Sequence, residues 1–153
     1  MPAVTFMGSS LAKTGVLGNI SPSRRDWSDI ELGARIAREV SRLDIGQTVV
    51  VKKGTVLAVE GFEGSDKAIR RGGELGHGRV TVVKVSKPGH DLRFDVPCVG
   101  ERTIQILHEA RAAALAVQAG GALLIKPQGV IEACDQFGIA LVGIELAAEP
   151  DCR

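Results

Sequence analysis

The chain has 153 residues, of which 44% are hydrophobic and 24% are charged, a composition typical of one globular domain. Its 19 basic and 18 acidic side chains nearly cancel, and aromatic residues make up only 3%. The basic surface and the stacking aromatic residues of a nucleic-acid-binding protein are therefore missing. No apolar run reaches the roughly 18 residues that a membrane-spanning helix needs. We expect a soluble protein without a nucleic-acid partner.

The cysteines and the two ends of the chain indicate its compartment and its domain limits. Cys98, Cys134 and Cys152 are widely spaced and form no C-x-x-C pair, which argues against a disulfide framework or a structural zinc site and favours a reducing cytoplasm. The start of the chain lacks the basic residues of a signal peptide, and many turn formers predict an extended leader with little regular structure. We expect a flexible leader over residues 1–23, a folded domain over 24–146 and a tail over 147–153.

The first predicted elements are a helix and a hairpin. Asp26 or Ser28 can cap a helix whose apolar residues recur at three- and four-residue steps as far as Leu43. Residues 47–51 and 55–59 are β-branched runs joined by a short segment that contains glycine, which predicts a β-hairpin.

A second helix and a central strand follow. The helix is predicted to begin at Ser65, whose side chain can accept a backbone N–H, and to carry Leu75 on its apolar side. Residues 80–85 form a continuous β-branched run, which predicts a strand buried on both faces.

The last third of the chain repeats this alternation. Helical spacing covers residues 103–113, and two short strands, 115–118 and 122–125, read as a second hairpin-like pair. Pro127 begins a final helix that Gly138 ends, followed by a buried strand at 139–144. The sequence therefore predicts an α/β fold, a single domain with a mixed β-sheet flanked by about four helices.

The segment of residues 84–100 concentrates charge among prolines and glycines directly after the predicted central strand. Basic side chains here can neutralise a diphosphate, and the carboxylates can hold a divalent ion or orient a water, although a charged surface loop has the same composition. His90 is the one histidine that falls inside the segment. We predict Cys98 to be a packing thiol, since no nearby base is assignable. The predicted diphosphate-binding residues are Lys84, Lys87 and Arg93. The predicted acidic residues are Asp91 and Asp95.

A second candidate loop lies at the start of the helix predicted from Ser65. Glu60, Glu63 and Asp66 surround glycines there, and backbone N–H groups at a helix N-terminus can hold a phosphate. Gly64 and Ser65 are the predicted substrate-binding residues of this loop, and Glu63 is a candidate metal ligand. Capping and solvation of the loop are the alternative explanation.

Three runs of the sequence resemble the C-terminal domain of the LpxI family. They are LDIGQTVVV at 43–51, AVEGFEGSD at 58–66 with IRR at 69–71, and KVSKPGHDLRFDVP at 84–97. The resemblance extends from about Gly15 to Gly143 and keeps the order of the three runs. Family members are UDP-2,3-diacylglucosamine pyrophosphatases of lipid A synthesis.

The resemblance implies hydrolysis of UDP-2,3-diacylglucosamine to UMP and lipid X with a divalent cation such as Mg²⁺. The essential aspartate of the family's Arg-Phe-Asp-x-Pro-like run matches Asp95. The implied partner is a lipid-linked nucleotide sugar, so the implied location is the cytoplasm, with peripheral contact to the inner membrane face. The acyl-sugar substrate and the metal are implied by the resemblance alone.

This sequence departs from the family in two ways. Family members carry a further N-terminal domain of comparable size that helps to hold the substrate, and Cys98 replaces a small hydroxyl residue expected in many relatives. The chain is therefore either a piece of a longer enzyme or a single-domain relative. For the second case the alternatives are a nucleotide- or lipid-binding module without turnover, and a homo-oligomer that recreates the missing half of the cleft.

Overall fold

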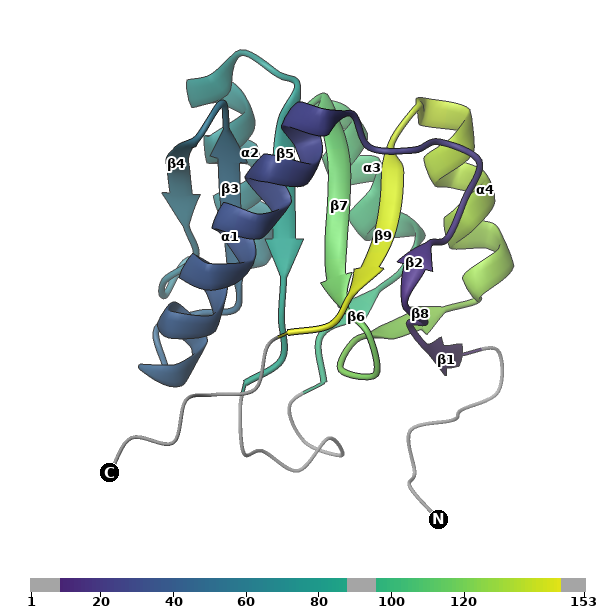
Figure 1. Cartoon of the computed structure of the whole chain (residues 1–153), viewed down its shortest axis with the longest axis horizontal. Coiled ribbons are helices and arrows are strands. Elements are labelled where there is room, and N and C mark those ends of the chain that lie inside the picture. Colours follow the sequence, from purple (N-terminus) through teal and green to yellow (C-terminus); the bar gives the residue numbers. More distant parts are fainter. Residues whose placement is uncertain (1–8, 88–95, 147–153) are drawn as a thin grey trace.

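The structure is a computed structural model that describes residues 9–87 and 96–146 (Figure 1). Its main sheet has six strands in the order β2-β9-β7-β5-β3-β4. The three central strands β5, β7 and β9 are parallel, whereas β3 is antiparallel to β5, β4 to β3, and β2 to β9. The mixed sheet predicted from the sequence is confirmed. Its strands are β2 (Gly15–Val16), β3 (Thr48–Lys52), β4 (Thr55–Val59), β5 (Val80–Lys84), β7 (Ala112–Gln118) and β9 (Ala140–Ile144).

A second, three-stranded sheet has the order β1-β8-β6, with β1 (Ser9–Leu11), β8 (Leu123–Ile125) and β6 (Cys98–Val99). Two sequence predictions are corrected here. Within the predicted leader, residues 9–11 and 15–16 form short strands, because β1 pairs with β8 and β2 pairs with β9. The runs 115–118 and 122–125 do not form a hairpin, because β7 and β8 belong to different sheets. In both cases the partner is distant in sequence, so local turn residues do not reveal it.

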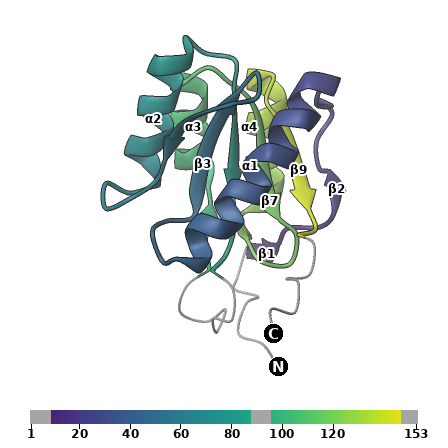
Figure 2. The same cartoon turned by 60° about the vertical axis from the view of Figure 1, so that its left-hand side comes forward.

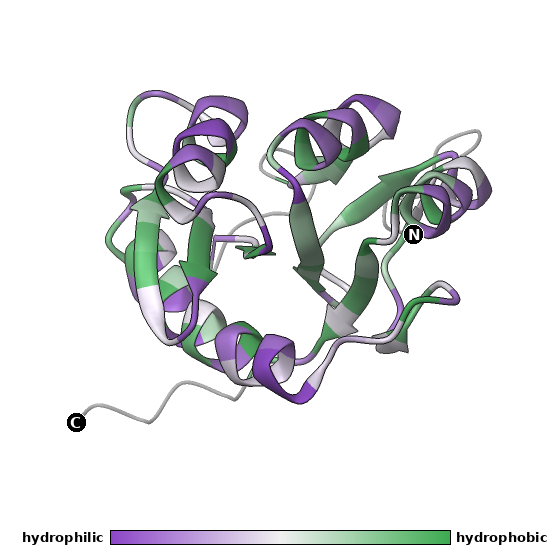
Figure 3. Cartoon of the chain, turned by 90° about the horizontal axis from the view of Figure 1, so that it is seen from above, coloured by the Kyte–Doolittle hydropathy of each residue, from purple (hydrophilic) through white to green (hydrophobic). Residues whose placement is uncertain are grey.

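Within the described residues, four helices cover the six-stranded sheet in two outer layers. The helix α1 (Arg24–Arg42) lies on one face, and α2 (Ser65–Gly76), α3 (Glu101–Glu109) and α4 (Pro127–Phe137) lie on the other (Figure 2). Apolar residues fill the strands and the inner helix faces, while polar residues face outward (Figure 3). This arrangement confirms the predicted α/β domain. No helix within residues 9–87 and 96–146 is long and apolar enough to cross a membrane.

The helix beginnings differ from the predicted ones. Ser23 caps α1 in a capping box: its Oγ accepts from the Asp26 N–H at 3.1 Å, and the Asp26 carboxylate accepts from the Ser23 N–H at 2.9 Å. The predicted cap at Asp26 or Ser28 is therefore one turn too late. In α2 the cap position is Gly64 and not Ser65, and Leu75, predicted to be on the apolar side, is 56% exposed.

Two glycines bring α2 close to its neighbours. A Cβ at Gly72 would lie 2.5 Å from Cγ1 of Val50, and one at Gly73 would lie 2.9 Å from the backbone oxygen of Ala110. These positions therefore let α2 approach β3 and α3 more closely than any larger residue allows. The last helix matches its prediction, since α4 begins at Pro127 and Gly138 follows it in the left-handed region.

Candidate functional site

The carboxyl ends of β5, β7 and β9 lie at one edge of the main sheet, at the bottom of Figure 1. Because β3 runs the opposite way, its first residue Thr48 pairs with Lys84, the last residue of β5. We call this end of the sheet the carboxyl edge; it is the end at which Thr48, Lys84 and Gln118 lie, not an outer strand. Open α/β sheets bind ligands beyond the carboxyl ends of their strands. The candidate site therefore lies at this end of the sheet.

Lys84 lies in the middle of the carboxyl edge, between Thr48 of β3 and Val117 of β7. It is only 9% exposed, and burial lowers the pKa of its ammonium group below the ordinary value of 10.5. The negative charges of Glu60 and Asp66 partly oppose that lowering. Among the residues that the structure describes, none forms a hydrogen bond or ion pair with the Lys84 Nζ. Its charge is thus held at the edge without a direct partner from that part of the chain.

A small hydrogen-bond network lies beside Lys84. The Thr48 and Ser65 hydroxyl oxygens are 2.9 Å apart, and the Ser65 hydroxyl donates to Oε1 of Glu60 at 3.2 Å. The same Oε1 accepts from the Gln47 N–H at 3.0 Å. Thr48 is fully buried. These bonds connect the start of β3, the loop after β4 and the first residue of α2.

The N-terminus of α2 opens onto this network. Its cap residue Gly64 has φ 91° and offers no side chain to the first-turn N–H groups. Asp66 in that first turn forms an ion pair of 3.5 Å with Arg102 of α3. The predicted position of Ser65 at the helix start is confirmed, but its hydroxyl bonds to Glu60 instead of capping the helix.

Two further contacts fix the chain where it leaves β5. The Gln118 Oε1 accepts from both the N–H and the hydroxyl of Ser86, at 3.0 and 2.9 Å. Lys87, predicted to bind substrate, forms an ion pair of 2.6 Å with Asp44 after α1. Sequence reasoning missed Gln118 and Thr48. The available signals were a polar residue near the start of the predicted strand 47–51 and another at the end of the predicted strand 115–118.

Glu63, a predicted metal ligand, pairs with Arg71 of α2. Nη2 of Arg71 lies 2.5 Å from Oε1 of Glu63, and Nε of Arg71 lies 3.4 Å from Oε2. The guanidinium therefore contacts both carboxylate oxygens. The hydrogen bond from Arg71 is the main cause of the lowered pKa of Glu63. A metal role for Glu63 stays a prediction, and it requires this pair to open.

Most of the predicted acidic loop falls outside the described residues. His90, Asp91, Arg93 and Asp95 are among residues 88–95, so their roles stay predictions. Within residues 9–87 and 96–146, no three side chains of His, Cys, Asp or Glu come together as a metal site.

Cys98 corrects another prediction, since this thiol is exposed and does not pack in the core. It begins β6, a two-residue strand that buries Val99 and turns Cys98 outward. Of the two cysteines that the structure describes, Cys134 is buried, and burial raises the pKa of its thiol to about 12.

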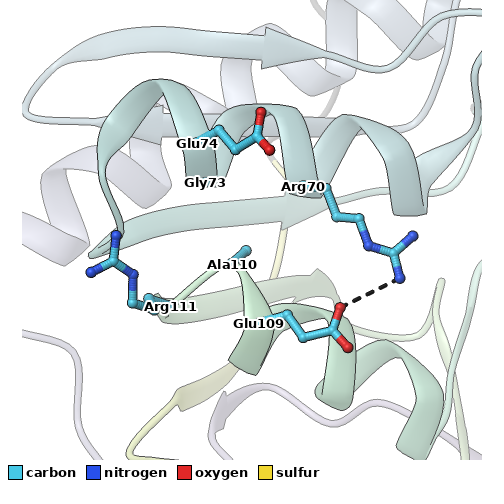
Figure 4. Close-up of a pocket in the computed structure, with 6 residues that line it drawn as sticks. All are labelled: Arg70, Gly73, Glu74, Glu109, Ala110 and Arg111. Carbon is cyan, nitrogen blue, oxygen red and sulfur yellow. Dashed lines mark hydrogen bonds and ion pairs between the residues drawn. The ribbon is translucent and has the colours of Figure 1, made fainter.

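Two recesses of the described surface lie away from Lys84. One, of about 260 Å³, lies between α2 and α3, where Arg70 and Glu109 form an ion pair of 3.4 Å and Arg111 closes one end (Figure 4). The other, of about 340 Å³, lies between α1 and β9 and includes Trp27. Neither recess includes a residue that the sequence predicted to be functional.

The residues of this domain match a known protein family. The family model for the LpxI C-terminal domain matches residues 13–142, which is most of the chain. The chain belongs to this family. It is also 36% identical over 152 residues to the UDP-2,3-diacylglucosamine pyrophosphatase LpxI of Caulobacter vibrioides, an alignment that covers 94% of this chain and 54% of the relative. The chain thus spans about half the length of that relative, and the resemblance predicted from three sequence runs is confirmed.

Proposed function

We propose that this domain forms the diphosphate-binding side of an enzyme that hydrolyses UDP-2,3-diacylglucosamine to UMP and lipid X. The observation that carries this proposal is the family match, together with the name of the Caulobacter relative. The carboxyl edge supports it, because it combines a buried cation with an uncapped helix N-terminus. Both features attract phosphate oxygens.

In this proposal Lys84 and the first N–H groups of α2 bind the diphosphate. The Lys84 ammonium lies in a low-dielectric position, where an ion pair with phosphate is stronger than it would be in water. Gly64 leaves the α2 N–H groups accessible, and the Ser65 hydroxyl lies at the same helix end. Arg93 and Lys87 would add positive charge as negative charge develops on the phosphate oxygens.

Asp95 is the proposed catalytic residue, holding and orienting the water that attacks phosphorus. The proposed divalent ion, Mg²⁺ or a similar cation, would bind Asp91 and Asp95 with Glu63, and when bound it would polarise the diphosphate. The described residues do not by themselves provide a fitting set of metal ligands. The proposed metal role therefore rests on the resemblance to the family.

The acyl chains of the proposed substrate place the reaction beside a membrane. We therefore propose a cytoplasmic location with peripheral contact to the inner membrane face, since the relative's name gives a doubly acylated nucleotide sugar, UDP-2,3-diacylglucosamine, as its substrate. A lipid-linked nucleotide sugar is the proposed partner of the domain.

A chimera tests the proposed activity. The half of the Caulobacter relative that this chain does not cover is joined to residues 1–153, and UMP release is measured from UDP-2,3-diacylglucosamine with Mg²⁺. The matched control is the same chimera with Asp95→Ala. We expect UMP from the first and at least a hundredfold less from the second. If the intact relative releases UMP while a folded chimera does not, the proposed function of this domain is wrong.

A second candidate function is a binding module that holds nucleotide or lipid without turnover, because the buried Lys84 and the uncapped N-terminus of α2 could bind a phosphate without hydrolysing it. Titration calorimetry of this chain with UMP, UDP and lipid X separates the two. Binding by the chain combined with an inactive chimera supports the module. No binding and no turnover leaves a structural role.

A further inference from the structure

Gln118 connects the ends of two neighbouring strands at the carboxyl edge. It is the last residue of β7, and its Oε1 accepts from the N–H and the hydroxyl of Ser86 at 3.0 and 2.9 Å. The chain packs closely around this contact, because a Cβ at Gly121 would lie 2.6 Å from the Ser86 Oγ and 2.9 Å from the Gln118 Cδ. Two hydrogen bonds and close packing therefore hold the Gln118 amide in one position.

The same bonds determine which way the amide faces. A backbone N–H can only donate, so the Gln118 atom next to Ser86 is the oxygen, and the Nε2 group with its two N–H donors points away from Ser86. Within residues 9–87 and 96–146, no group accepts a hydrogen bond from this Nε2. The buried side-chain atoms without a partner in that part of the chain are Gln47 Nε2 and Thr81 Oγ1, so the Gln118 Nε2 reaches solvent.

This free donor group lies at the same strand ends as Lys84. In the parallel pair of β5 and β7, Lys84 lies beside Val117, the residue before Gln118. Paired Cα atoms are about 4.8 Å apart and consecutive ones about 3.8 Å apart, so the Cα atoms of Lys84 and Gln118 lie within about 9 Å. The Gln118 side chain also extends toward β5, since it contacts Ser86, two residues after Lys84. One ligand of the size of a diphosphate can therefore contact both side chains.

We propose that Gln118 is a further substrate-binding residue, whose Nε2 group donates to a phosphate oxygen of the diphosphate while Ser86 holds its amide in place. The inference rests on the proposed function for the identity of this anion. The free half of the amide has two donors and no acceptor, which suits the oxygens of an ionised diphosphate because these only accept. Its orientation is set before the ligand arrives, so little side-chain entropy is lost on binding.

The alternative is that Gln118 only fixes the chain where it leaves β5, in which case its Nε2 group does not respond to an anion. The test titrates this chain with inorganic pyrophosphate and records the ¹⁵N–¹H signals of the side-chain amides and the ¹³Cε signals of the lysines. Gln118→Glu identifies the Gln118 amide signal, because it keeps oxygens that can accept from Ser86 and removes the amide nitrogen. Lys84→Met identifies the Lys84 signal.

We expect the Gln118 amide signal and the Lys84 signal to shift together, with one dissociation constant. Gln136 in the last turn of α4, at the opposite end of the main sheet, is the internal control, and its amide signal should not move. A shift of the Lys84 signal without one of the Gln118 amide overturns this inference and leaves the proposed diphosphate site intact. No shift of either signal at millimolar pyrophosphate overturns both.

The affinity for pyrophosphate, measured by titration calorimetry, provides an independent check. Gln118→Met removes the amide and should raise the Kd about tenfold, the effect of losing one hydrogen bond to a charged oxygen. Ser86→Ala keeps the backbone N–H that orients the amide, so it should raise the Kd less. An equal loss in the two variants would mean that the path of the chain after β5, and not the Nε2 donor, explains the effect, which overturns the proposal.

The decisive spectra are those of the unmodified chain. Should a variant fail to fold, the Gln118 amide signal is assigned through bonds from its own backbone, and the Lys84 signal likewise. The same pyrophosphate titration then decides the question. No substrate is hydrolysed in any of these measurements, so an inactive chain does not affect the result.

Discussion

The two edges of the main sheet use buried charge differently. At the edge opposite the carboxyl edge, Asp29 of α1 is 4% exposed, and its two oxygens accept from the N–H groups of Lys53 and Gly54 at 2.9 and 2.8 Å. At the carboxyl edge, Lys84 is 9% exposed and has no such bonds within the described residues. The Asp29 carboxylate holds the turn between β3 and β4, whereas no residue in the described part of the chain forms a hydrogen bond with the Lys84 ammonium group.

This difference has an energetic consequence. A buried charge that is fully hydrogen-bonded can stabilise a fold, but one without a partner costs free energy of folding. Asp29 is therefore a buried charge whose hydrogen bonds support the fold, whereas the burial of Lys84 opposes stability. Binding groups commonly sit at such positions, since an anion can supply the missing partner.

The largest expected contrast is in the reactivity of two thiols. In a chain that carries Cys152→Ser, a thiol reagent at pH 8 should modify Cys98 near the carboxyl edge more than about a hundredfold faster than Cys134, because only the thiolate reacts and Cys134 is buried with a pKa of about 12. The absorbance of the coloured group that the reagent releases on reaction measures both rates. Cys98→Ser is the control and should remove the fast phase; equal rates would contradict the described burial.

Removal of the Asp29 carboxylate should give the largest loss of stability. Asp29→Ala leaves two turn N–H groups without their acceptor and should lower the free energy of unfolding by about 2 kcal/mol, as measured by urea denaturation. Asp29→Asn retains one oxygen acceptor and should lose less. If Asp29→Ala is as stable as the parent chain, Asp29 does not hold the turn as described.

Replacement of Lys84 should have a smaller effect of the opposite sign. Lys84→Met removes a buried charge and should raise the free energy of unfolding at pH 7 by on the order of 1 kcal/mol. Burial lowers the folded pKa of Lys84 below 10.5, so between these two values the unfolded chain binds more protons and stability rises with pH. The advantage of Lys84→Met should therefore shrink as pH rises toward 10.5. Urea denaturation at pH 7 and pH 10 measures this change, and an advantage that grows with pH would contradict it.

The smallest effect on stability is expected for the exposed ion pair of Glu63 and Arg71 beside the carboxyl edge. Glu63→Gln removes the charge that pairs with Arg71 and should leave the urea midpoint at pH 7 unchanged, because surface ion pairs contribute little to stability. Arg71→Ala is a useful comparison, since Arg71 also donates to the Val59 carbonyl at 3.2 Å. A large loss in Glu63→Gln would mean that this pair organises the loop before α2.

The sequence predicted most elements because hydrophobic periodicity reflects burial. Residues 80–84 are a β-branched run and form β5, with Val80, Val82 and Val83 fully buried. The turn glycine correctly predicted the β3–β4 hairpin. Element ends were less predictable, as in α1, because several residues near its start can cap a helix and only the backbone geometry selects Ser23.

The candidate site was predicted as two separate loops, one containing Lys84 and one containing Ser65. Strand pairing brings the two loops together. Because β3 lies between β4 and β5, Thr48 of β3 pairs with Lys84 and its hydroxyl contacts that of Ser65. Glu60 appeared in the sequence only as one of several acidic residues. Its bonds to Gln47 and Ser65 depend on that pairing and have no sequence signal.

The sequence by itself determined the α/β class, the buried strands and the family of this domain, because these follow from local periodicity and from runs of consecutive residues. The tertiary structure decided which polar groups are buried and which of them have partners. Asp29 and Lys84 are both charged residues beside apolar runs, yet only the packing shows that one is bonded to a turn and the other is held at the carboxyl edge. That difference depends on strand order and helix placement, which bring together residues far apart in the chain.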